Sequence, residues 1–247
     1  MHTLRTSPRL AAGIALLTLG CFLAGSAAAE PTFARMQTDA GEILLVLYPD
    51  LSPFHVTNFT HLAETGFYNG TYFHRVIPGF MIQGGDPNTK DGDPRNDGTG
   101  GPTLKDVLDD QDWQEVEKVN ALLEARGYAG LQGQASLKAE FNEVPHTRGT
   151  LSMARSRSFD SAGSQFFICV AEASSLNNQY TVFGHVVSGM DVADTIVGAE
   201  LDPAAGRDHP AVPVHITGME ILHGTGDLTP EENLAWNELA PELQHQP

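Results

Sequence analysis

Basic residues and cysteine are scarce in this chain of 247 residues. Lys and Arg total 14 against 31 Asp and Glu, which gives a formal net charge of −17. A chain this acidic repels nucleic acid and anionic lipid, so we expect its partners to be proteins or peptides. Two cysteines cannot build a disulfide framework, and we expect Cys169 to be a buried small hydrophobe.

Several common catalytic patterns are also missing from the sequence. It has no Gly-x-Ser-x-Gly elbow, no phosphate-binding glycine loop followed by Lys, and no His-Glu-x-x-His zinc helix. The 10 histidines lack the spacing of metal ligands. We therefore expect no metal, no cofactor and no covalent catalysis.

No apolar stretch is long enough for a simple membrane-spanning helix. Residues 10–24 form an apolar run of about 15 residues, short of the ~20 that a spanning helix needs. Arg5 and Arg9 precede this run, and alanines at 27–29 offer a small-x-small cleavage pattern. We expect residues 1–29 to be a removable export signal, and the mature chain to be periplasmic or secreted and free of the membrane.

Two alternatives to cleavage remain open at this N-terminus. The apolar run could serve as a membrane anchor, or Cys21 could carry a lipid, although Thr18 stands where a lipoprotein signal usually has an aliphatic residue. Cleavage would leave Cys169 as the single cysteine and would make the net charge two units more negative, since Arg5 and Arg9 are lost.

Short strand-like stretches dominate the remaining chain. Apolar runs bounded by turn residues predict strands at 32–38, 42–48, 72–82 (two strands around a Pro-Gly turn), 150–154, 165–171, 181–187 and 214–222. Apolar residues at helical spacing predict core helices at 52–65, with Ser52 as N-cap, and at 190–197. Many short strands with few helices predict one mainly β domain, a barrel or a sandwich.

Two further segments look like additions to this domain. Residues 103–136 contain a helical pattern that starts near Asp112, with Glu115 completing a capping box, and ends at Gly127. We expect its apolar face to pack on the barrel; the alternative is a lid or a ridge that binds client proteins. The acidic tail 224–247 contains a short predicted helix and is expected to be docked on the surface or flexible.

Three motifs carry the strongest functional signal. They are FHRVIPGFMIQGGD at 73–86, GTLSMA at 149–154 followed by GSQFFIC at 163–169, and VFG at 182–184. In this order and spacing they resemble the cyclophilin-type peptidyl-prolyl cis–trans isomerases. The resemblance covers about residues 32–223, apart from the insertion 103–136.

The resemblance implies a fold and a groove. The fold is a closed eight-stranded antiparallel β-barrel capped by two helices, here spanning 30–223 with the helical insertion. A substrate groove on the outside of the barrel would be lined by Arg75, Phe80, Met81, Gln83, Ala154, Phe167 and Leu176. Phe166 would lie in the core, because neighbouring residues of a strand face opposite sides.

The resemblance also implies roles for the groove residues in rotating an Xaa–Pro bond. Arg75 would act as the electrostatic catalytic group on the proline nitrogen, and Gln83 would orient it. Phe80, Met81, Phe167 and Leu176 would hold the proline ring.

Three positions depart from the family pattern. Ser175 stands where the family often has a tryptophan that favours cyclosporin binding, so we expect weak inhibition by cyclosporin. Tyr180 replaces the usual histidine at the pocket edge and keeps an aromatic wall. Arg155 replaces an asparagine and adds a cation that would favour acidic substrates.

The predicted function is isomerisation of proline bonds during the folding of exported proteins. Its partners would be proline-containing peptides and unfolded exported proteins, bound by a monomer. The alternative is a non-catalytic module or chaperone that binds proline peptides in the same groove.

Overall fold

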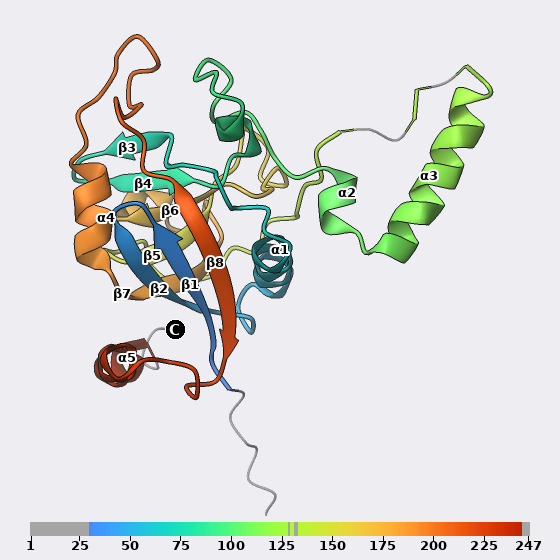
Figure 1. Ribbon diagram of the computed structural model, residues 1–247. Coiled ribbons are helices and arrows are strands. Elements are labelled where there is room, and N and C mark those ends of the chain that lie inside the picture. Colours follow the sequence, from blue (N-terminus) through green and yellow to red (C-terminus); the bar gives the residue numbers. More distant parts are fainter. Residues whose placement is uncertain (1–29, 128, 131–132, 244–247) are drawn as a thin grey trace, which may run out of the picture.

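The computed structural model describes residues 30–127, 129–130 and 133–243. At its centre lies one curled antiparallel sheet in the order β3-β4-β6-β5-β7-β2-β1-β8 (Figure 1). The strands are β1 (Thr32–Thr38), β2 (Gly41–Leu47), β3 (Arg75–Ile77), β4 (Met81–Gly84), β5 (Thr150–Met153), β6 (Phe166–Cys169), β7 (Val182–Ser188) and β8 (Ile216–His223). Each predicted strand segment contains a strand, so the mainly β prediction is confirmed.

The predicted closed barrel is wrong, because the edge strands β3 and β8 do not pair with each other. The backbone N–H of Val76 in β3 donates to the carbonyl of Asp208, 2.9 Å away in the loop before β8. That loop takes the donor that a continuous ladder would need. The edges meet just before each strand, through a bridge between Tyr72 and His215, and the sheet is an open half-barrel.

Two helices cover the two open ends of the half-barrel and pack against the same core (Figure 1). They are α1 (Pro53–Glu64) and α4 (Met190–Val197), which agree with the predicted ranges. Each buries its apolar stripe in the core; the buried apolar residues are Val56, Phe59, Leu62 and Ala63 in α1, and Ala193, Ile196 and Val197 in α4.

Aromatic rings fill the inside of the half-barrel. The ring centroid of Phe59 lies 5.2 Å from that of Tyr68, 5.6 Å from Phe166 and 5.1 Å from Phe183. All four side chains are fully buried, and such ring pairs add about 0.5–1.5 kcal/mol each beyond the area that they bury. The predicted core position of Phe166 is confirmed.

The predicted N-cap position of Ser52 in α1 is confirmed, but another residue caps the helix with its side chain. Ser52 occupies the N-cap position, but its hydroxyl donates to the carbonyl of Val182, 2.7 Å away. The carboxylate of Glu140 instead accepts from the backbone N–H groups of Phe54 and His55, at 3.2 and 2.9 Å. A distant residue thus satisfies the free N–H groups and complements the helix dipole.

Residues 104–127 of the insertion form an arm that projects from the body (Figure 1). It contains α2 (Leu104–Val107), which contacts α1, and α3 (Asp110–Glu124). The predicted capping box is wrong: Asp109 is the N-cap and accepts from the backbone N–H of Asp112. The predicted packing on the barrel is also wrong, because no residue of α3 is buried and Leu122 is 61% exposed.

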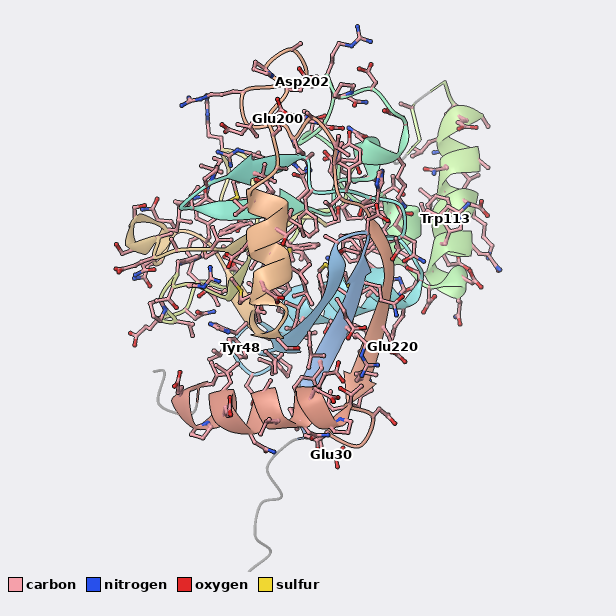
Figure 2. All side chains as sticks on the ribbon, turned by 60° about the vertical axis from the view of Figure 1, so that its left-hand side comes forward. Glu30, Tyr48, Trp113, Glu200, Asp202 and Glu220 are labelled. Carbon is pink, nitrogen blue, oxygen red and sulfur yellow. The ribbon has the colours of Figure 1, made fainter. Side chains whose placement is uncertain are left out.

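The C-terminal segment forms α5 (Pro230–Leu243), which lies across one end of the sheet against β7 (Figures 1 and 2). Its Trp236 packs edge-on against Phe33 of β1, with ring centroids 5.1 Å apart. Glu232 accepts two hydrogen bonds from Arg35, at 2.9 and 2.7 Å. The predicted docking on the surface therefore holds for 230–243.

The described loops include two short 3₁₀ helices, η1 (Pro87–Lys90) and η2 (Ser174–Leu176). Among the described residues, no helix combines the length and the apolar character needed to cross a bilayer. The predicted export signal, residues 1–29, lies outside the described residues.

Candidate active site

One hollow on the outer face of the half-barrel is surrounded by all the predicted site residues. Its volume is about 200 Å³. It is lined by Arg75, Phe80, Met81, Gln83, Ala154, Arg155, Phe167, Leu176 and Tyr180. The apolar members form a cluster separate from the main core. The structure thus brings the predicted set together, while the role of each residue remains a prediction.

Strands β4 and β6 form the floor of this hollow. Because side chains alternate along a strand, every second residue of each strand faces it. Met81 and Phe167 belong to the outer cluster, while Ile82 and Phe166 belong to the core inside the half-barrel. Gln83 pairs in register with Phe167. An amide side chain therefore stands directly beside the apolar floor.

Aromatic and aliphatic side chains make the hollow an apolar receptacle. Met81 and Phe167 are 2% and 4% exposed. Tyr180 meets Phe167 edge-on, with ring centroids 5.6 Å apart and planes at 85°. Phe80 and Leu176 pack against the same cluster. Such a concave apolar surface binds a small ring and excludes water from it.

His146 supports this floor from behind, and the sequence carries no motif that would single it out. Its ring stacks on Phe167, with centroids 5.9 Å apart and planes at 17°. Its Nε2 lies 3.0 Å from the hydroxyl of Ser152, and its Nδ1 lies 3.1 Å from Oδ1 of Asn177. Burial lowers the pKa of His146, so the ring is neutral at pH 7 and packs as an aromatic side chain.

Arg75 stands at the rim of the hollow, on the short edge strand β3. Its Nε donates to Oδ2 of Asp208 at 3.3 Å, and its Nη1 donates to Oε1 of Gln83 at 3.4 Å. The side chain of Arg75 is 43% exposed, so solvent still reaches the guanidinium. The sequence predicts the contact with Gln83 but carries no signal for Asp208, which lies 133 residues further along the chain.

A second amide fixes the orientation of Gln83. The Nε2 of Gln83 donates to Oε1 of Gln165 at 2.9 Å, and the Nε2 of Gln165 donates to the carbonyl of Gly100 at 2.8 Å. The oxygen of Gln83 is therefore turned toward Arg75. Gln165 lies inside the motif 163–169, but the motif alone does not indicate this role.

Arg155 also lines the hollow, with its guanidinium over two aromatic rings. Its guanidinium carbon is 4.4 Å from the ring centroid of Tyr180 and 4.7 Å from that of Phe159. Its Nε donates to the carbonyl of Gln179 and its Nη1 to the carbonyl of Ser156, both at 3.0 Å. These contacts hold a permanent positive charge beside the apolar floor.

Two further hollows adjoin the first. One, of about 490 Å³, is lined in part by residues 134–136 at the end of the insertion. The other, of about 400 Å³, is lined in part by loop residues 205–209. Gln83 and Arg155 line all three hollows, which together form one groove.

The described residues show no activated nucleophile at this groove. Cys169 is buried beneath it, and burial raises the pKa of its thiol to about 12, so the thiol stays protonated at neutral pH. Within the described ranges, no three His, Cys, Asp or Glu side chains gather in a way that would hold a metal ion. What the groove offers is a charged planar donor, oriented amides and an apolar receptacle.

Comparison with known proteins places this geometry in a family. Residues 33–221 match the family model described as "Cyclophilin type peptidyl-prolyl cis-trans isomerase/CLD". A relative from Brucella suis, described as "Probable peptidyl-prolyl cis-trans isomerase", is 38% identical over 203 residues, covering 80% of this chain and 88% of that protein. Peptidyl-prolyl cis-trans isomerase A of Dickeya dadantii is 35% identical over 219 residues, covering 86% and 96%.

Solved structures agree with the sequence relatives. A cyclophilin-type peptidyl-prolyl cis-trans isomerase of Cryptosporidium parvum superposes with a TM-score of 0.59 at 26% identity, covering 78% of this chain and 98% of that one. The same protein has been solved in the presence of the dipeptide Ala-Pro. From its motifs, its half-barrel and these relatives, the chain belongs to the cyclophilin-type peptidyl-prolyl cis–trans isomerase family.

Proposed function

We propose that this chain isomerises Xaa–Pro bonds in exported proteins while they fold, and that Arg75 supplies the main electrostatic stabilisation of the transition state. One observation carries the proposal. A permanently charged guanidinium stands at the rim of an apolar hollow of about 200 Å³, held there by a carboxylate and an amide.

The reaction needs a donor and an apolar receptacle, and no bond to carbon is made or cut. Rotation about a peptide bond costs ~18–20 kcal/mol because resonance is broken. In the twisted state the proline nitrogen is pyramidal and presents a basic lone pair. A donor aimed at this lone pair stabilises the transition state more than either planar ground state.

The hydrogen bonds of Arg75 support its role as this donor. Its Nε and Nη1 are engaged by Asp208 and Gln83, while its Nη2 has no hydrogen-bond partner among the described residues. The engaged nitrogens limit how the guanidinium plane rotates. The N–H groups that remain free can then donate to a substrate with a smaller loss of side-chain entropy.

The apolar floor supplies the rest of the acceleration. A charged hydrogen bond contributes about 1.5–3 kcal/mol net, which is roughly one to two powers of ten in rate. Phe80, Met81, Phe167 and Leu176 hold the proline ring and exclude water, which strengthens the contact with Arg75. Gln83 presents its amide to a substrate carbonyl.

The cellular setting rests on the N-terminal sequence. A basic start, a short apolar run and small residues at 27–29 support export of a mature chain that begins at Glu30. The clients would then be unfolded exported proteins that contain proline. The chain would bind them as a monomer, in the periplasm or outside the cell.

Two experiments test the proposal. Purified chain should accelerate the cis-to-trans exchange of an Ala-Pro peptide, followed by NMR; a folded chain without acceleration would leave only the peptide-binding role. The cellular setting is tested separately by fractionation and N-terminal sequencing, where a cytoplasmic protein that retains Met1 would contradict export.

A further inference from the structure

Arginine is concentrated at the groove of a chain that is otherwise acidic. The whole sequence has 14 Lys and Arg against 31 Asp and Glu. Three of these basic residues, Arg75, Arg155 and Arg207, nevertheless line the third hollow of the groove. The groove is therefore the place where a negatively charged ligand finds a favourable local field.

The acidic residues of the same hollow are already engaged. Asp208 pairs with Arg75 at 3.3 Å and lies 3.8 Å from Nε of Arg207. Asp97 accepts from the hydroxyl of Tyr72 at 2.6 Å and lies 3.0 Å from Nε2 of His209. Neither carboxylate faces Arg155 in an ion pair.

Among the described residues that line the groove, Arg155 is an arginine without a carboxylate partner. Its hydrogen-bond acceptors are two backbone carbonyls, those of Gln179 and Ser156, and its guanidinium carbon lies over the rings of Tyr180 and Phe159. No described carboxylate forms an ion pair with it. Because the rings and carbonyls already fix the guanidinium, a new carboxylate binds without first ordering a long side chain.

The position of Arg155 brings it close to the proline of a bound peptide. It lines the apolar hollow together with Phe167 and Tyr180, and it also lines both hollows on either side. A peptide whose proline occupies the apolar hollow must extend into at least one of the two adjoining hollows. Its residues next to the proline then pass within reach of Arg155.

We propose that Arg155 forms a carboxylate subsite, which makes peptides with Asp or Glu next to the proline the preferred substrates of this chain. The inference rests on the proposed isomerase function, because it assumes that the proline sits among Phe80, Met81 and Phe167. An ion pair at such a partly exposed site favours the acidic peptide by up to about fivefold.

The acidic surface of the chain does not cancel this preference. At physiological salt the Debye length is ~8 Å, so repulsion from distant carboxylates is largely screened, whereas a direct, partly buried ion pair is screened less. The preference should therefore be a property of the contact at Arg155 rather than of the net charge.

The test compares peptides that differ only in a carboxylate. Two pairs suffice: Ala-Glu-Pro-Phe against Ala-Gln-Pro-Phe, and Ala-Ala-Pro-Glu against Ala-Ala-Pro-Gln. The ratio of kcat/KM within each pair is measured for the wild-type chain, for Arg155→Gln and for Arg155→Lys. Arg157→Gln is the matched control, because Arg157 lies on the same loop but lines none of the three hollows.

The expected result is a ratio above one, up to about five, in at least one pair for the wild type, falling to about one in Arg155→Gln, partly retained in Arg155→Lys and fully retained in the Arg157→Gln control. Ratios near one in both wild-type pairs, or a ratio that survives Arg155→Gln, would overturn the subsite. Calorimetric titration with the same peptides separates the two proposals: tighter binding of the acidic peptide without turnover would keep the subsite and discard the isomerase.

Discussion

The carboxylate of Asp208 is expected to position the guanidinium of Arg75. Its Oδ2 lies 3.3 Å from Nε of Arg75, and its backbone carbonyl accepts from the N–H of Val76 at 2.9 Å, so the loop is tied to β3 by its main chain as well. Asp208→Ala removes the carboxylate and keeps the main-chain hydrogen bond. The change therefore frees Arg75 while the loop stays in place.

The size of the effect follows from the exposure of the two groups. The side chains of Arg75 and Asp208 are 43% and 25% exposed, so their pairing stabilises the oriented guanidinium by at most about 1 kcal/mol. This corresponds to a loss of up to about fivefold in rate. The loss should fall on kcat rather than KM, because Arg75 acts on the twisted bond while the apolar floor holds the proline.

The assay is NMR exchange or a protease-coupled assay on an Ala-Pro peptide, with thermal melting to show that each variant is folded. Asp208→Asn is the matched control: it keeps an acceptor for Nε, so its kcat should stay within about twofold of the wild type. An unchanged kcat in Asp208→Ala, or a rise in KM alone, would refute the positioning role. Equal losses in both variants would show that charge, and not the hydrogen bond, matters.

Three further predictions concern stability and inhibition. Arg35 holds the pKa of Glu232 below its ordinary value of 4.5, so the stabilisation is present above about pH 4.5 and is lost as the pH falls through the lower folded pKa. In urea unfolding the wild type should lose more free energy in acid than Glu232→Gln, and parallel curves would contradict this. Replacing 110–127 by a short Gly-Ser linker should change Tm by less than about 2 °C, since α3 buries no side chain; a larger drop in differential scanning calorimetry would show hidden packing. Cyclosporin should inhibit the wild type weakly, and Ser175→Trp should lower the inhibition constant. A submicromolar inhibition constant for the wild type would contradict this expectation.

The groove was the most predictable part of the molecule, because side chains alternate between the two faces of a strand. Arg75 to Gln83 form one continuous hairpin, and Phe167 lies on the neighbouring strand in register with Gln83. Local sequence therefore decides which side chains share the outer face. A motif of contiguous residues is sufficient when its members are placed by one hairpin and one partner strand.

The residues that support the groove were not predictable from local sequence. Asp208 and His146 reach Arg75 and Phe167 from loops outside the motifs, and Gln165, two residues before Phe167, meets Gln83 of another strand. Their positions depend on how the whole half-barrel folds. A carboxylate, an amide or an imidazole in a loop has many possible partners, and its own neighbours in sequence do not choose among them.

The predictions about the packing of the insertion and about the closure of the barrel were wrong for a related reason. A helical apolar pattern predicts that 110–124 is a helix, but it does not say what the helix contacts, and α3 leaves its Val119 and Leu122 exposed. Closure depended on the pairing of one edge, and there the backbone N–H of Val76 in β3 donates to the carbonyl of Asp208 and not to β8.

The most direct test of the central claim is the exchange rate of an Ala-Pro peptide with the wild-type chain, with Arg75→Ala and with Arg75→Lys. The account predicts acceleration by the wild type, a loss of roughly ten- to hundredfold in Arg75→Ala with an unchanged melting curve, and partial recovery in Arg75→Lys, which keeps the charge without the planar fork. A folded Arg75→Ala variant that retains the full rate would contradict the electrostatic role of the guanidinium.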